Sequence, residues 1–167
     1  MNRKQASLTE RRFLLPFVLI TTLFFLWGFA RAILDVLNKH FQNELHISIA
    51  QSALIQVTTY LGYFIMAIPA GLFINRFGYR RGVVFGLSLF ALGAFLFVPG
   101  AKIGTFEVFL AALFTIGCGL TFLETAANPY VTELGAPQTA TSRLNLSQSF
   151  NGLGSIFATF SVGLFLF

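Results

Sequence analysis

FEVFLAALFTIGCGLTFLETAANPYV, residues 106–131, is the stretch of sequence that decides the fold. Nearly all of it is apolar, and its only charged side chains are Glu107 near the start and Glu124 further along. A helix of this length reaches about 39 Å at about 1.5 Å per residue, and the hydrocarbon core of a bilayer is about 30 Å thick. The stretch therefore predicts a helix that crosses a membrane.

Four further stretches have the same apolar character and enough length to span a bilayer. They are residues 13–41, 49–74, 82–99 and 144–167. The whole chain is 56% hydrophobic and 10% charged, whereas soluble domains carry about 25% charged residues. We predict an all-α membrane protein with five transmembrane helices. Residues 1–12 are expected to form a cytoplasmic N-terminal tail, and residues 13–167 a partial transmembrane bundle.

The basic residues indicate which helix ends face the cytoplasm, because cytoplasmic loops of membrane proteins are enriched in lysine and arginine. One side of the predicted bundle carries Arg3, Lys4, Arg11, Arg12, Arg76, Arg80, Arg81 and Arg143, and the other side carries Lys39 and Lys102. This bias places the N-terminus in the cytoplasm. We expect the membrane to be a plasma membrane or a bacterial inner membrane. It also explains the net charge of +5 by topology, without nucleic-acid binding.

Several classes of soluble protein are excluded by what the chain lacks. A single cysteine, Cys118, rules out a disulfide scaffold, and the two distant histidines, His40 and His46, make no zinc cluster. No phosphate-binding loop or nucleophile elbow occurs in the sequence. We therefore expect no enzyme activity, no metal and no cofactor.

The first stretch carries an acid, Asp35, at membrane depth, where a charge is costly and usually functional. Trp27, Arg31, Asp35 and Asn38 follow one another at helical spacing and share a face. One interpretation is a structural ion pair of Asp35 with Arg31, one turn away. The other is that Asp35 faces a watery cavity and binds a ligand. Trp27 and Asn38 would then suit a sugar, whose apolar face stacks on a ring while its hydroxyls hydrogen-bond.

The fourth stretch carries the second acid, Glu124, on one face with Asn128. No basic residue lies in this stretch, and an isolated carboxyl in an apolar medium favours its neutral form. We expect Glu124 to gain and lose a proton, which is the property that a proton-coupled carrier needs. The alternative is a permanently protonated side chain that donates one hydrogen bond to a neighbouring helix.

The fifth stretch is polar along one sector. It carries Asn145, Gln148, Ser149, Asn151 and Ser155. Amide side chains both donate and accept hydrogen bonds, which suits a ligand with many hydroxyls. They also hold membrane helices together, and the sequence does not separate the two interpretations.

The third stretch has no buried polar group, but Gly82, Gly86 and Gly93 lie on one of its faces. Small residues at this spacing let two helix backbones approach closely. We predict that this face packs against a neighbouring helix.

Four motifs carry a resemblance to a known family. GLFINRFGYRR (71–81) resembles the loop between helices two and three of the major facilitator superfamily, with Gly71, Asn75, Arg76, Gly78, Arg80 and Arg81 at motif positions. Asn75 stands where the family usually has an acid. FLWGFARAILDVLNKHF (25–41), LETAANPYV (123–131) and RLNLSQSFNGLG (143–154) are similar to the fucose, galactose and glucose proton symporter branch, also called L-fucose permease-like.

This resemblance implies a sugar/proton symporter that works by alternating access. Asp35 matches the first-helix acid of the branch, implicated in sugar binding or coupling, and Glu124 matches its fourth-helix acid, implicated in proton coupling. Asn128 and Gln148 fall on polar motif positions. The implied partners are a small-molecule sugar, protons and the lipid bilayer, with no nucleic acid and an open oligomeric state.

Two departures from the family bear on function. Arg31, Ala32 and Leu34 stand where fucose permeases place amides before the first-helix acid, which leaves the identity of the sugar open. The family also has twelve helices in two similar halves, so the resemblance implies an N-terminal part without its sixth helix and second half. We expect such a chain not to transport alone. The alternative is a truncated, non-transporting membrane scaffold or assembly partner.

Overall fold

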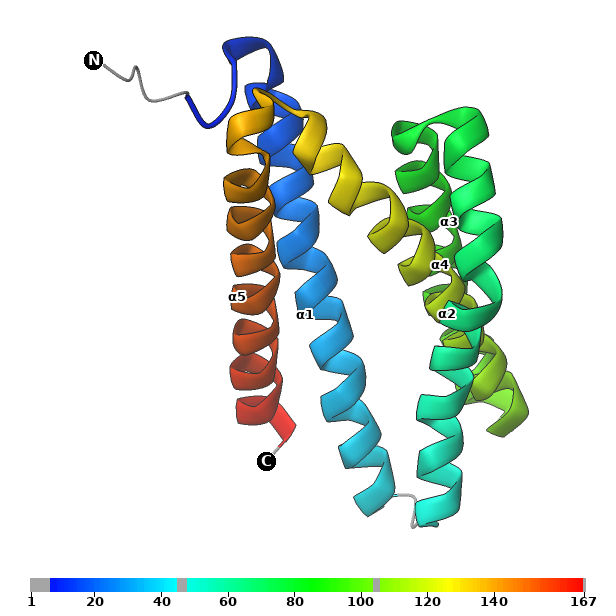
Figure 1. The fold of residues 1–167 in the computed structure, drawn as a ribbon. Coiled ribbons are helices and arrows are strands. Elements are labelled where there is room, and N and C mark those ends of the chain that lie inside the picture. Colours follow the sequence, from blue (N-terminus) through cyan, green and yellow to red (C-terminus); the bar gives the residue numbers. More distant parts are fainter. Residues whose placement is uncertain (1–6, 45–47, 104–105, 167) are drawn as a thin grey trace, which may run out of the picture. The chain divides into compact units, whose positions relative to one another are not determined.

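The computed structural model describes residues 7–44, 48–103 and 106–166, which form five α-helices and two short 3-10 turns. Figure 1 shows the ribbon. The helices are α1 (Leu14–Glu44), α2 (Ile49–Phe77), α3 (Tyr79–Ile103), α4 (Phe106–Glu133) and α5 (Ala140–Leu166). The turns are η1 (Arg11–Phe13), which leads into α1, and η2 (Pro137–Thr139), which leads into α5. The all-helical fold class is confirmed.

Four of the five predicted membrane spans are supported by the described helices. The segments long and apolar enough to cross a membrane are Arg11–Val36, Ala50–Phe77, Tyr79–Pro99 and Phe106–Glu133. Of the fifth predicted span, residues 144–167, the described part (144–166) forms most of α5, but α5 is not among these segments. Its amide and hydroxyl side chains make α5 less apolar than the others. That α5 crosses the membrane therefore stays a prediction.

The chain divides into two compact units. Unit 1 consists of residues 1–41 and 128–167, and it contains α1, the end of α4 and α5. Unit 2 consists of residues 42–127, and it contains α2, α3 and most of α4.

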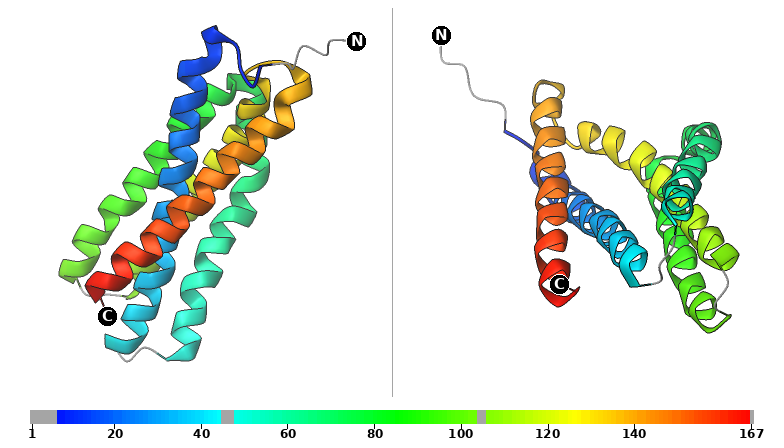
Figure 2. Two further views of the ribbon diagram at one scale, coloured as in Figure 1. Left: turned by 90° about the vertical axis from the view of Figure 1, so that its left-hand side faces the viewer. Right: turned by 90° about the horizontal axis from the view of Figure 1, so that it is seen from below.

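In unit 1, α1 and α5 lie side by side and run parallel (Figures 1 and 2). Their contacts pair Thr21 Oγ1 with Ser147 Oγ at 3.0 Å, Asn151 Nδ2 with the carbonyl of Phe24 at 3.0 Å, and Ser155 Oγ with the carbonyl of Gly28 at 3.1 Å. Residue numbers rise together on both helices, in steps of about one turn. The polar face of α5 therefore makes a ladder of hydrogen bonds along α1.

Glycines let these two backbones touch. A Cβ added at Gly28 would overlap the carbonyl oxygen of Asn151, and one added at Gly154 would overlap the carbonyl oxygen of Phe25. This close approach brings Asn151 and Ser155 within reach of α1 carbonyls. For these two side chains, the structure supports the interpretation that polar groups of α5 hold helices together.

In unit 2, the small residues of α3 pack against α4, as predicted. Gly82, Gly86 and Gly93 are all buried. A Cβ at Gly86 would lie 3.0 Å from the carbonyl oxygen of Gly119, and a Cβ at Gly93 would lie 2.6 Å from Ile116 Cγ1. The glycine face of α3 is therefore a helix-packing surface.

Replacing Gly93 by alanine should destabilise unit 2, because the added methyl group has no room against α4. We expect Gly93→Ala to lower the free energy of unfolding by about 1–3 kcal/mol, as overpacking does. Gly152→Ala is the matched control, since Gly152 is a helical, exposed glycine with no atom within 4 Å of an added Cβ. The control should raise stability slightly, because alanine is the better helix former. Thermal unfolding in detergent measures both, and shifts of the same sign would contradict the packing argument.

Candidate functional site

Trp27 is placed by α1 in the interior of the protein. Its side chain is 6% exposed, and its ring centroid lies 5.6 Å from that of Phe24. The indole Nε1–H is buried and has no hydrogen-bond partner among the described residues. A buried donor without an acceptor is uncommon, because it has lost its bond to water and gained none in return. Trp27 therefore offers an unused donor.

Asp35 lies two turns further along α1, and its side chain is exposed, as is that of Arg31. The side chain of Asn38 falls outside the described residues. The carboxyl of Asp35 makes no hydrogen bond or ion pair to another described residue. An exposed carboxylate on a helix this apolar needs a polar medium beside it, either water or a polar ligand.

An amide pair joins α4 to α5 in unit 1. Gln148 Nε2 donates to Asn128 Oδ1 at 3.0 Å. Asn128 is half-buried and Gln148 is exposed. This bond leaves the Nδ2 group of Asn128 and the Oε1 atom of Gln148 without a partner among the described residues. The pair thus keeps one unused donor on Asn128 and one unused acceptor on Gln148.

Glu124 lies on α4 one turn before Asn128, so the two share a face of the same helix. Its side chain is half-buried. Within the described ranges, the carboxyl has neither a hydrogen-bond partner nor an ion-pair partner. This agrees with the lack of basic residues in its stretch of sequence. Glu124 is therefore a half-buried acid whose carboxyl has no partner within the described residues.

The turn between α2 and α3 carries the loop motif. Gly78 has a φ of 84°, a conformation that favours glycine, and its N–H donates to the carbonyl of Ile74 at 2.8 Å. This reversal puts the motif residues on the outside of unit 2. Asn75, Arg76, Arg80 and Arg81 are exposed, and Gly71 is half-buried with open space where a Cβ would be. The motif makes no ion pair within the described residues.

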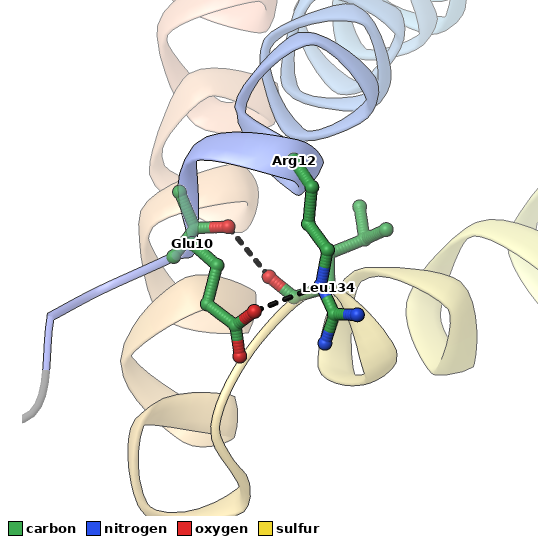
Figure 3. A network of polar contacts seen from close by, with 4 residues as sticks. Glu10, Arg12 and Leu134 are labelled. Carbon is green, nitrogen blue, oxygen red and sulfur yellow. Dashed lines mark hydrogen bonds and ion pairs between the residues drawn. The ribbon is translucent and has the colours of Figure 1, made fainter.

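The segment before α1 is bound to the connection between α4 and α5, although the sequence predicts only a tail. Thr9 Oγ1 donates to the carbonyl of Leu134 at 2.7 Å. Figure 3 shows this carbonyl beside the ion pair of Glu10 and Arg12, whose Oε2 and Nε atoms are 2.8 Å apart. Both ion-pair side chains are largely exposed, so the pair adds little stability.

Sequence reasoning missed one buried residue of this region, Arg143 at the start of α5. In the sequence, Arg143 is counted only as one of the basic residues that indicate the topology. In the structure it is 0% exposed and surrounded by backbone carbonyls. No sequence signal separates a buried arginine at a helix start from an exposed one, since its partners are main-chain atoms that every residue has.

Comparison with known proteins gives the family. The Major Facilitator Superfamily model matches residues 20–167. An L-fucose-proton symporter of Haemophilus influenzae is 51% identical over 155 residues, which cover 93% of this chain and 36% of that protein. A glucose/galactose transporter of Brucella abortus is 47% identical over 139 residues, which cover 83% of this chain and 34% of that protein.

The fold is shared with a solved transporter. A crystal structure of the Escherichia coli fucose:proton symporter superposes with a TM-score of 0.81 at 45% identity, over 92% of this chain and 37% of that one. The chain therefore spans about a third of the length of these relatives. The relatives are transporters, and the apolar helices make this chain an integral membrane protein. It belongs to the major facilitator superfamily.

Proposed function

We propose that this chain supplies the first helices of a proton-coupled sugar symporter that works by alternating access. The observation that carries the proposal is the arrangement on α4. Glu124, whose carboxyl is unpaired within the described residues, lies one turn before Asn128 on this helix, and Asn128 is hydrogen-bonded to Gln148. A group for the proton and a group for hydroxyls thus follow one another on a single helix face. The identity of 51% to an L-fucose-proton symporter supports the same function.

In this proposal the sugar is bound by Asp35 and Asn38 of α1 together with Asn128 and Gln148. The carboxylate accepts hydrogen bonds from the sugar hydroxyls, and the amides both donate and accept them. Trp27 contributes its indole N–H, which has no partner among the described residues. Arg31 beside Asp35 is the departure that leaves the sugar open among fucose, galactose and glucose.

The proposal also fixes an orientation. The N-terminus, the α2–α3 turn and the α4–α5 connection face the cytoplasm, because they carry eight of the chain's basic residues. In transporters built from helix repeats, the substrate site lies near the bilayer midplane between the repeats. We therefore propose that α5 crosses the membrane and that further helices complete the site. The alternative to a symporter is a non-transporting membrane scaffold, and transport assays distinguish the two.

Transport assays on two forms of the protein test this proposal. The full-length gene product in proteoliposomes should accumulate at least one of radiolabelled L-fucose, D-galactose and D-glucose when an inward proton gradient is imposed. The 167-residue chain alone should give no saturable uptake, since a third of the relatives' length does not enclose a site between two halves. Proton-driven uptake by the 167-residue chain would contradict the argument that this chain alone does not enclose a substrate site. If neither form takes up sugar, the non-transporting scaffold is favoured.

Replacing Glu124 by glutamine should separate proton coupling from sugar movement. Glutamine keeps the shape and hydrogen bonding of a protonated glutamate but carries no titratable proton. We expect Glu124→Gln to abolish accumulation against a gradient and to spare counterflow exchange. Glu107→Gln is the matched control, since Glu107 is an exposed acid at the start of the same helix. Normal accumulation by the Glu124 variant would remove this residue from the coupling role.

Replacing Asp35 by asparagine should weaken sugar binding. The neutral amide is a weaker acceptor than a carboxylate, and hydrogen bonds to charged groups are roughly twice as strong as neutral ones. We expect the half-saturation concentration for counterflow to rise about tenfold, within the range lost with a hydrogen bond to a charge. Arg31→Ala distinguishes the two interpretations of Asp35. If Asp35→Asn leaves affinity and uptake unchanged while Arg31→Ala impairs folding, the structural ion pair is the correct interpretation.

A further inference from the structure

Arg143 is a buried cation whose partners are all uncharged oxygens. Its side chain is fully buried, and no ion pair to it occurs within the described residues. Nε donates to the carbonyl of Val131 at 3.0 Å, Nη2 to the carbonyl of Thr132 at 2.6 Å, and Nη1 to the carbonyls of Leu8 and Ala136 and the hydroxyl of Thr139 at 2.9, 3.1 and 2.7 Å. The guanidinium therefore ties together three separate pieces of backbone, which are residues 131–132, Leu8 and Ala136.

The end of α4 suits this cation. Val131 and Thr132 lie in the last turn of the helix, whose final carbonyls have no intrahelical partner. These carbonyls also form the negative end of the helix dipole. A guanidinium has five donors in a planar fork, so it reaches both carbonyls and the flanking groups at once. The buried charge is thus solvated by main-chain dipoles in place of a carboxylate.

The segment before α1 forms the other side of the enclosure. We call residues 7–10 the N-terminal strap. Thr139 Oγ1 lies 3.2 Å from the carbonyl of Leu8, to which it can donate while it accepts from Arg143. Thr9 Oγ1 donates to the carbonyl of Leu134. The strap is therefore held at two points on the α4–α5 connection, one of them through the guanidinium.

Gly135 leaves the space that the guanidinium fills. Its φ is 151°, which is unfavourable for other residues, and an added Cβ would lie 2.7 Å from Nη1 of Arg143. The turn after α4 is thus shaped so that the arginine can enter. A side chain here would displace either the turn or the guanidinium.

Arg143 and its carbonyl partners lie on the same two helices as the amide pair of Asn128 and Gln148. Arg143 precedes Gln148 by five residues on α5, and its carbonyl partner Val131 follows Asn128 by three residues on α4. We propose that Arg143 is a positioning residue. By holding the last turn of α4 against the first turns of α5, it sets the register at which Asn128 and Gln148 meet. This inference rests on the proposed function, because it assigns the amide pair to the sugar.

Arg143→Lys tests the proposal in the full-length gene product, with L-fucose, D-galactose and D-glucose as probes. Lysine keeps the positive charge but presents a single compact group, so it cannot hold both α4 carbonyls and the strap. We expect the half-saturation concentration for counterflow of the transported sugar to rise about tenfold, since small displacements of a binding group are costly. The maximal rate should stay within about twofold of the unmodified protein's. Arg11→Lys is the matched control, because Arg11 is an exposed arginine that directly follows the strap in the sequence.

A double-mutant cycle with Gln148→Ala separates positioning from a general loss of stability. If Arg143 acts through the amide pair, Arg143→Lys should change affinity less than about twofold once Gln148 is alanine, because coupled residues are not additive. Equal changes in both backgrounds would overturn the proposal, as would an unchanged affinity with a lowered melting temperature. If Gln148→Ala alone leaves affinity unchanged, the assignment of the amide pair to the sugar fails. The single variant shows this without the double mutant, so the two failures can be told apart.

Thr139→Val is the milder variant if Arg143→Lys does not fold. Valine has the shape of threonine and removes only the hydroxyl that accepts from Nη1 at 2.7 Å. We expect Thr139→Val to raise the half-saturation concentration about two- to threefold. This increase should disappear in the Gln148→Ala background. An additive effect in this second cycle would also overturn the positioning role.

Discussion

The contact between helix backbones is the constraint on which the rest of this structure depends. Lipid is as apolar as the helix surfaces, so burial of apolar side chains does not hold the helices together, and close packing and hydrogen bonds have to do so. Unit 1 brings α1 and α5 together at Gly28 and Gly154, and unit 2 brings α3 and α4 together at Gly86 and Gly93. Among the described residues, some polar side chains therefore bond across these contacts, as Asn151 and Ser155 do, and others do not.

That division sorts the polar residues of the candidate site. Asn151 and Ser155 donate to carbonyls of α1, so part of their hydrogen-bonding capacity is already used for structure. Asp35 and Glu124 are unpaired within the described residues, and the Asn128–Gln148 pair keeps a donor and an acceptor unused. An acid left unpaired on an apolar helix is costly. The groups that stay unpaired within the described residues are thus the ones that we assign to sugar and proton.

Much of this arrangement can be predicted from the sequence. Apolar length predicts the helices, the glycine spacing of α3 predicts its packing face, and charge at membrane depth selects Asp35 and Glu124. The uses of Asn151 and Gln148 cannot be predicted, because an amide looks the same whether it meets a carbonyl, another amide or a ligand. Arg143 is missed for a related reason, since its partners are backbone atoms brought together only by the folded chain. The polar content of α5 also lowers its apolarity below that of the other helices.

The parallel ladder between α1 and α5 limits how the gene can change in length. Its rungs join Thr21 to Ser147, Phe24 to Asn151 and Gly28 to Ser155, so the two helices advance in step. One residue inserted into α1 between the first and last rung would turn everything after it by about 100°. Gly28 would then leave the contact, and a bulkier neighbour would meet the backbone of α5. Insertions and deletions are therefore not compatible with this stretch, where the count of residues matters as much as their identity.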